Sequence, residues 1–390
     1  MRRFSKFLLA TLATCVTTGA ATAQMAAQNS WNTATTTTAP VAYVYVDGFL
    51  SYTSSRIYGF AAAPNGHLTP ISGSPFATPV SALALNGKYL FGTYSPPPPQ
   101  PNGIYTYSIA ANGSIKQADF LDKTDLPSNY FSLIDLTLDH TGNSLYAGFT
   151  DGVGDNGYES FSINQTNGQL KFVNVAYTAV DAYGFISFVG NNEYAYGADC
   201  YHTDPLLYGL ARGSSGGLTE IATNSAMPPA PPSSYGYCPL SVAADPYNDL
   251  AVSLVEQQGT PGPAKYQLAV YTADAYGHLS TTSTYQNMPL TAVEPDFVSM
   301  SPKGYYLAAT GNTGLQIFLM HGSKPLTVLT GAILPGVSLG EAFWDNHEHL
   351  YVINRSQLYV FNVSTNGVSQ ARGSPYSIPA AVQSLSVLPK

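Results

Sequence analysis

The sequence predicts an all-β fold, a seven-bladed β-propeller of four-stranded antiparallel blades whose ring is closed by the C-terminal strand. One hairpin pattern recurs seven times along the 390 residues. The composition, with 29 Tyr, 35 Gly and 28 Pro, favours aromatic strands separated by tight turns. A last apolar segment has nothing after it to pair with, which indicates that the chain returns to the sheet where it began.

The recurring hairpin has a short alternating strand, a turn and a second short strand led by Leu, Ile or Val. The turns lie about 44 to 60 residues apart, the length of four short strands with their loops. A single sheet of this size cannot bury both faces, so the units must stack in a closed ring. The first strands of the seven hairpins begin at Ile57, Ile104, Phe161, Leu207, Leu268, Leu315 and Leu358, and only the sixth turn lacks its glycine.

A second kind of hairpin precedes the first in each unit, so that each blade has strands a, b, c and d in chain order. The a–b turns are polar or carry glycine, which supplies the positive φ that such turns need. Clear instances are 85–89, 139–143, 245–249 and 301–305.

The first unit opens with strands at 41–46, 56–60 and 68–72 but has no inner strand before them. The segment 381–388 follows the last hairpin, and we expect it to be that missing inner strand. Removing the last ten residues should therefore open the ring. An irregular β-sandwich is the alternative, but seven units with the same order of strands and turns favour the propeller.

The N-terminus predicts export. Arg2, Arg3 and Lys6 precede an apolar stretch and then an Ala-x-Ala site, so residues 1–23 have the layout of a secretory signal peptide. We expect a secreted or periplasmic protein with a flexible Thr/Ala-rich tether at 24–40 and one propeller domain at 41–390. A retained N-terminal anchor and a lipid anchor at Cys15 are the alternatives.

The charge balance excludes some partners. A net charge of -8 without a basic run argues against nucleic acid. The mature chain contains no predicted transmembrane span, and we expect a monomer whose partner is a protein, a glycan or a small molecule. No cofactor is required by any motif in the sequence.

Strand direction places the b–c loops and the loops between blades on one face, where the long insertions lie. We expect the functional site on this face.

Cys200 and Cys238 both fall on this face, and export favours a disulfide between them, with two free thiols as the alternative. Asp151 and Asp155 lie in a Gly-rich loop that could hold a structural Ca²⁺, or could be a solvated turn. His347-Glu348-His349 resembles a zinc motif, but the repeat register places it in an a–b turn on the opposite face, as it does His140.

Acid–base chemistry needs carboxylates or a histidine at a shared position. Glu294, Asp296 and Glu341 immediately precede inner strands and should point toward the mouth of the central channel. These three are candidate catalytic residues, with solvated loop carboxylates as the alternative. Further candidates on this face are His202 and Arg355 for catalysis, and Arg56, Asp204 and Glu256 for binding.

The hairpin Ile57–Phe60 with 65–71 and Gly73–Phe76 resembles the lactonase-like seven-bladed propellers related to 6-phosphogluconolactonase. The resemblance covers nearly the whole mature chain and implies the same fold. Enzymes of that family open sugar lactones at the channel mouth with Glu, Arg and His. This chain lacks their Gly-Pro-Arg-His run and their Asn-Glu pair, so no catalytic residue can be carried over.

Two hypotheses follow. The chain is an envelope or extracellular module that binds a ligand through its loop-rich face. Alternatively, it is a hydrolase or isomerase that acts on a sugar lactone or sugar acid at the channel mouth.

Overall fold

A computed structural model describes residues 39–51, 55–94, 102–126, 132–150, 156–178, 184–200, 206–221, 227–259 and 262–390. Residues 1–38, with the predicted signal peptide and most of the predicted tether, lie outside the described residues. The described part is built of strands, with one short 3-10 helix, η1 (Lys123–Asp125). In that part, no helix has the length and apolar character that a membrane span requires.

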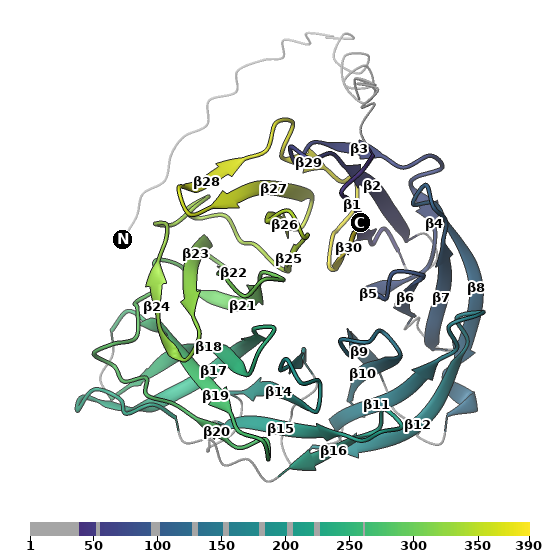
Figure 1. The fold of residues 1–390 in the computed structure, drawn as a ribbon. Helices are drawn as coiled ribbons and strands as arrows, with labels where there is room; N and C mark the ends of the chain where they lie inside the picture. The colour runs from purple at the N-terminus through teal and green to yellow at the C-terminus, as the bar shows by residue number, and fades with distance from the viewer. Residues whose placement is uncertain are drawn as a thin grey trace, which may run out of the picture. The chain divides into compact units, whose positions relative to one another are not determined.

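Seven antiparallel sheets stand around a central axis, which confirms the predicted seven-bladed propeller (Figure 1). In blades two to seven, the strands follow each other in chain order from the axis outward. Blade two holds β5 (Ser81–Leu85), β6 (Tyr89–Tyr94), β7 (Gly103–Ile109) and β8 (Ile115–Asp122), and blade three holds β9 (Ser132–Leu138), β10 (Ser144–Thr150), β11 (Asn156–Ile163) and β12 (Leu170–Tyr177). Blade four holds β13 (Ser187–Phe188), β14 (Tyr194–Asp199), β15 (Leu206–Arg212) and β16 (Leu218–Ile221), and blade five holds β17 (Ser234–Ala244), β18 (Asp249–Gln258), β19 (Tyr266–Ala273) and β20 (Leu279–Ser280). Blade six holds β21 (Pro295–Met300), β22 (Tyr306–Gly311), β23 (Gly314–His321) and β24 (Lys324–Val328), and blade seven holds β25 (Ala342–Trp344), β26 (His349–Ile353), β27 (Gln357–Ser364) and β28 (Gly367–Gln370), with β29 (Tyr376–Ser377) beside β27.

The first blade joins both ends of the fold. Its strands β1 (Ala42–Gly48), β2 (Arg56–Ala62), β3 (Leu68–Pro70) and β4 (Phe76–Ala77) come from the start of the domain. Its inner strand is β30 (Leu385–Pro389), which pairs antiparallel with β1 and lies beside it in Figure 1. This confirms the predicted closure. The strand begins at Leu385 and not at Ala381, because Ala381 makes only an isolated bridge to Phe49.

The hydrophobic core lies between the blades. Buried side chains form seven clusters, and each cluster joins two blades that are neighbours in the ring. One of them packs Phe91 of β6 against Leu145 and Phe161 of blade three. Apolar area is thus removed from water only where two sheets meet, which is why the ring must be complete.

Tyrosine hydroxyls fasten some blades to the next. Tyr45 of β1 donates to the carbonyl of Gly113 in the c–d turn of blade two, at 2.7 Å. Tyr196 of β14 donates to the carbonyl of Gly277 in the same turn of blade five, at 2.8 Å. Both glycines have positive φ, and a Cβ on Gly113 would lie 2.7 Å from the ring of Tyr43. The repeated turn glycine is therefore required by backbone conformation and by close packing.

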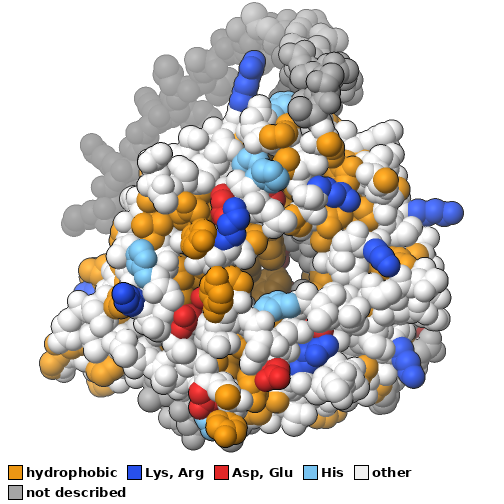
Figure 2. Space-filling model, viewed as in Figure 1, with side chains coloured by type: hydrophobic (Ala, Val, Ile, Leu, Met, Phe, Trp, Pro, Cys, Tyr) orange, Lys and Arg blue, Asp and Glu red, His pale blue; other side chains and the backbone are white. Residues whose placement is uncertain are grey.

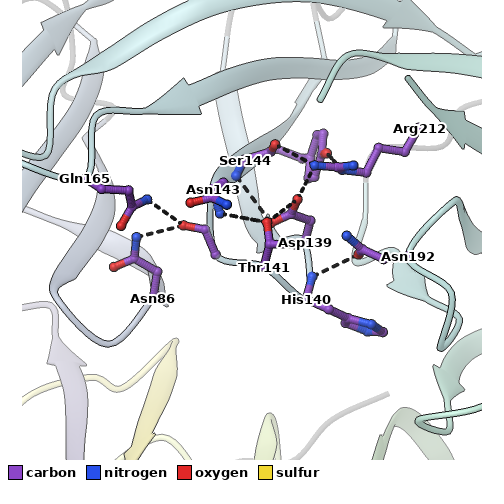
Figure 3. A network of polar contacts seen from close by, with 11 residues as sticks. Asn86, Asp139, His140, Thr141, Asn143, Ser144, Gln165, Asn192 and Arg212 are labelled. Atoms are coloured by element: carbon purple, nitrogen blue, oxygen red, sulfur yellow. Dashed lines mark hydrogen bonds and ion pairs between the residues drawn. The ribbon is translucent and has the colours of Figure 1, made fainter. Parts of the chain in front are cut away.

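A polar network joins the a–b turns of blades two, three and four (Figure 3). The carbonyl of Gly142 accepts hydrogen bonds from Asn86 and Gln165, and the His140 amide donates to Asn192. Asp139 forms an ion pair with Arg212 of β15, and its side chain is fully buried. Because a buried carboxylate needs a partner, this pair fixes blade four against blade three.

The residues His347, Glu348 and His349 lie where the repeat register places them, around the turn between β25 and β26. Asp345 accepts a hydrogen bond from the ring of His349 and another from the Tyr351 hydroxyl, both at 2.8 Å. This buried arrangement caps the turn.

Deleting residues 381–390 should remove β30, expose the inner edge of β1 and open the apolar layers that the first blade shares with its neighbours. We expect loss of the cooperative thermal transition in circular dichroism. A synthetic peptide of residues 381–390, added in excess, should restore the transition. A truncated protein that melts like the intact chain would contradict the closure.

Candidate functional site at the channel mouth

Four inner strands carry a β-bulge near the end that faces the b–c loops and the loops between blades. The extra residues are Ala82 in β5, Leu240 in β17 and Asp296 in β21, and in β9 residues 134–135 share one partner position. A bulge re-aims the side chains beside it, and bulges are frequent next to functional sites. Two of the four place a carboxylate at the bulge, Asp135 and Asp296.

Asp47 is the last residue but one of the apolar strand β1 and is fully buried. Its Oδ1 accepts hydrogen bonds from the backbone amides of Gln383 at 2.8 Å and Ser384 at 2.7 Å. Its Oδ2 has no hydrogen-bond partner among the described residues. Burial raises the pKa of Asp47 to about 6, although the two amide hydrogen bonds act in the opposite direction.

Glu341 meets the same segment from blade seven. Its Oε2 accepts hydrogen bonds from the Ser384 hydroxyl at 3.2 Å and from the Leu385 amide at 2.7 Å. The Ser384 hydroxyl in turn accepts a hydrogen bond from the amide of Leu83. Ser384 therefore stands between the carboxylates of Asp47 and Glu341.

Asp135 belongs to the inner strand of blade three, yet it interacts electrostatically with Glu341 of blade seven. These blades are not neighbours, so the interaction crosses the channel, whose opening Figure 2 shows at the centre of the ring. Burial raises the pKa of Asp135 to about 7. Burial also raises the pKa of Glu341 well above its usual value, and the charges of Asp135 and Asp47 raise it further.

The three predicted catalytic carboxylates do not lie together in the structure. Glu294 and Asp296 lie together in blade six, where the charge of Glu294 adds to burial in raising the pKa of Asp296. Asn312 donates a hydrogen bond to Asp296 at 2.9 Å. Glu341 instead interacts with Asp47 and Asp135. Sequence reasoning missed these last two, although both are carboxylates at the end of, or within, an apolar strand.

The structure gives Glu256, Arg355 and Arg56 contacts other than those of the carboxylates above. Glu256 forms an ion pair with Lys265, with the charged atoms 3.4 Å apart. Arg355 is exposed, and its backbone carbonyl accepts the amide of Val382. Arg56 begins β2, where its charge lowers the pKa of Tyr58 against the larger effect of burial.

Four predicted residues, Asp151, Asp155, His202 and Asp204, lie outside the described residues, so the calcium site stays a prediction. Within the described part of the chain, no group of three or more His, Cys, Asp or Glu could hold a metal ion.

A disulfide joins Cys200 and Cys238 in the structure, with their Cα atoms 5.1 Å apart. Cys200 follows β14 and Cys238 lies in β17, so the bond links blades four and five on the loop-rich face. Cys238 is buried.

A pocket of about 230 Å³ opens on this face between blades one and two. Its walls combine aromatic or aliphatic side chains with hydroxyl and amide groups. They come from Phe49, Ser55, Pro79, Val80, Ser81, Tyr94 and Gln383. Because Asp47 holds the backbone of Gln383, the pocket adjoins the buried carboxylates. A hollow of about 510 Å³ on the outer hairpin of blade three lies away from the channel.

No family model matches the chain, and no curated protein matches it. Solved structures match its fold. A candidate 6-phosphogluconolactonase from Bacteroides fragilis has 16% identity and a TM-score of 0.58 over 89% of this chain and 98% of that chain. A second from Bacteroides uniformis has 13% identity and a TM-score of 0.61 over 89% and 99%. A hypothetical selenium-binding protein from Sulfolobus tokodaii has 10% identity and a TM-score of 0.59 over 90% and 94%.

These comparisons and the seven sheets define the class of protein. The chain is a seven-bladed β-propeller with the architecture of the lactonase-like propellers, which confirms the resemblance in fold seen in the hairpin pattern. At such low identity the likeness concerns the fold alone.

The raised pKa values predict a pH dependence of stability. The folded protein holds protons on Asp47 and Asp135 up to about pH 6 and 7, whereas an unfolded chain releases them near pH 4. The stabilisation from these groups is therefore complete in acid and is lost as the pH rises through this range. We expect the melting temperature to fall between pH 5 and 8, measured by calorimetry.

The variant Asp47→Asn keeps the Oδ1 acceptor without the charge and should flatten this fall. The effect on the free energy of unfolding should be at most roughly 3 kcal/mol, since one pKa unit corresponds to about 1.4 kcal/mol. Glu193→Gln, which removes an exposed carboxylate in the a–b turn of blade four, is the control and should leave the slope unchanged. A melting temperature that rises toward pH 8 in the unaltered protein would contradict the assignment.

Proposed function

We propose that the protein is an exported binding module that holds a neutral, polyhydroxylated small molecule, such as the end of a glycan, in the pocket between blades one and two. The observation that carries this proposal is the lining of that pocket. Its volume of about 230 Å³ is below that of sites for drug-sized ligands and suits a small molecule such as one sugar ring.

The chemistry of the walls supports a sugar. Phe49 and Tyr94 offer aromatic rings, which pack against the apolar faces of sugars. Ser55, Ser81 and Gln383 offer hydroxyl and amide groups, which can both donate and accept hydrogen bonds. The described residues of the lining include no charged side chain, which favours a neutral ligand.

The proposed export rests on the N-terminal segment, whose basic start, apolar stretch and Ala-x-Ala site suit a secretory signal. A low content of charged residues, 10%, suits a module outside the cell, and the face seen in Figure 2 carries mostly uncharged side chains.

A glycan array followed by calorimetry on the purified protein tests the proposal. We expect saturable binding of at least one neutral sugar. Tyr94→Ala and Gln383→Ala should each weaken it by about tenfold, because each removes a direct contact. Tyr177→Ala is the control, since Tyr177 is exposed on the same face but outside the pocket lining. Failure of every neutral sugar to bind, or equal loss with the control, would contradict the proposal.

A second candidate function, hydrolysis of a sugar lactone in the channel, is favoured by Asp135. A general base works best when its pKa lies near the working pH, and the pKa of Asp135 is raised to about 7. In this reaction the carboxylate takes a proton from water as the water oxygen bonds to the lactone carbonyl carbon. The ring C–O bond then breaks, and the proton passes to the released alkoxide, giving the hydroxy acid.

A panel of sugar lactones with a pH indicator tests this candidate. We expect turnover to rise with pH through about 7 as Asp135 ionises, and Asp135→Asn to lower kcat by about a hundredfold. Asp274→Asn is the control. No turnover above the uncatalysed rate by the unaltered protein would remove this candidate and leave the binding module.

A further inference from the structure

Three phenylalanine rings meet in the central channel. Phe185 precedes the inner strand of blade four, Phe297 lies in that of blade six and Phe343 in that of blade seven. The ring centroids of Phe185 and Phe297 are 5.4 Å apart, and those of Phe297 and Phe343 are 5.8 Å apart. Blade five separates blades four and six, so the first of these contacts is made through the channel. All three rings keep part of their surface exposed.

Two carboxylates belong to an inner strand or precede one, Asp135 in β9 and Glu341 just before β25. Glu341 lies two residues before Phe343, and Asp135 interacts with Glu341 across the channel. Asp47 lies on the far side of Ser384 from Glu341, fully buried and with its Oδ2 lacking a hydrogen-bond partner among the described residues. An unpaired buried carboxylate oxygen is costly, so a donor or a cation at this place would be stabilising.

Within the described residues, no Lys, Arg or His side chain forms an ion pair with Asp47, Asp135 or Glu341. The ion pairs there use other carboxylates.

We propose that the central channel is a second binding site, which takes an organic ammonium cation between the rings of Phe185, Phe297 and Phe343 and the carboxylates of Asp135 and Glu341. Aromatic faces attract a cation through their quadrupole, most strongly where water is excluded. Asp135 supplies the opposite charge above about pH 7, where it is ionised, so the titration is made at pH 8. The net charge of -8 also draws cations toward the protein. The aromatic rings favour an organic ammonium over a small metal ion, which prefers oxygen ligands throughout. This site is distinct from the neutral pocket between blades one and two.

Isothermal titration calorimetry of the full chain at constant ionic strength tests this inference. The probes are tetramethylammonium, spermidine and 2,2-dimethylpropanol, a neutral molecule of the same shape as the first. We expect at least one ammonium to bind saturably and the neutral probe to bind at least about tenfold more weakly. Glu341→Gln and Asp135→Asn should each weaken ammonium binding by about tenfold, and Phe297→Leu by about threefold to tenfold.

Matched controls are Asp274→Asn and Tyr276→Leu, which alter an exposed carboxylate and an exposed ring in the c–d turn of blade five. Their ammonium affinity should be unchanged. The melting temperature of each variant reports whether it folds. If a carboxylate variant does not fold, Phe297→Leu still tests the inference. Absence of ammonium binding, equal binding of the neutral probe, or complete competition by calcium would overturn the inference. Sugar binding to the same protein would then still support the neutral pocket, so the two proposals can fail separately.

Discussion

The fold depends on one constraint, namely that no blade has a core of its own. The seven apolar clusters all lie between neighbouring sheets, so each blade is stabilised by two others. A chain built in this way has two open ends until its first and last segments join. The pairing of β30 with β1 makes that junction, and it adds Leu385 and Leu388 to the layers on the two sides of the first blade.

The junction and the candidate site share residues. Asp47 binds the amides of Gln383 and Ser384, just before β30 begins, while Glu341 binds Ser384 and Leu385 from the neighbouring blade. One of the groups that hold the last strand in place, Glu341, thus also interacts with Asp135 across the channel. Gln383 extends this connection to the pocket between blades one and two. Closure of the ring and the shape of the binding face are therefore linked through a few hydrogen bonds.

The sequence was sufficient to predict the architecture, because turn chemistry repeats locally. The glycine turns, the polar a–b turns and the unpaired last strand are all visible without knowledge of distant contacts. The sequence predicts a last strand from Ala381, four residues before β30 begins, because apolar residues such as Ala381 and Val382 precede the first ladder pair at Leu385. The register alone predicts a turn at His347-Glu348-His349; the structure places His347 in the turn between β25 and β26, whereas His349 begins β26.

The site was less predictable. Glu294, Asp296 and Glu341 share a position before inner strands, yet which carboxylates face each other depends on the width of the ring and on the bulges. The approach of Asp135 to Glu341 joins blades that are far apart in the chain. The contact between Phe185 and Phe297 likewise joins blades that are not neighbours, so no local sequence pattern predicts it.

The tyrosine contacts between blades have an evolutionary consequence. Tyr45 and Tyr196 donate to main-chain carbonyls, so the fastening does not depend on which side chains the accepting turn carries, provided that its glycine remains. The outer rim can therefore accumulate substitutions while adjacent blades stay joined. Solved structures that share only 10% to 16% of their residues with this chain have the same fold.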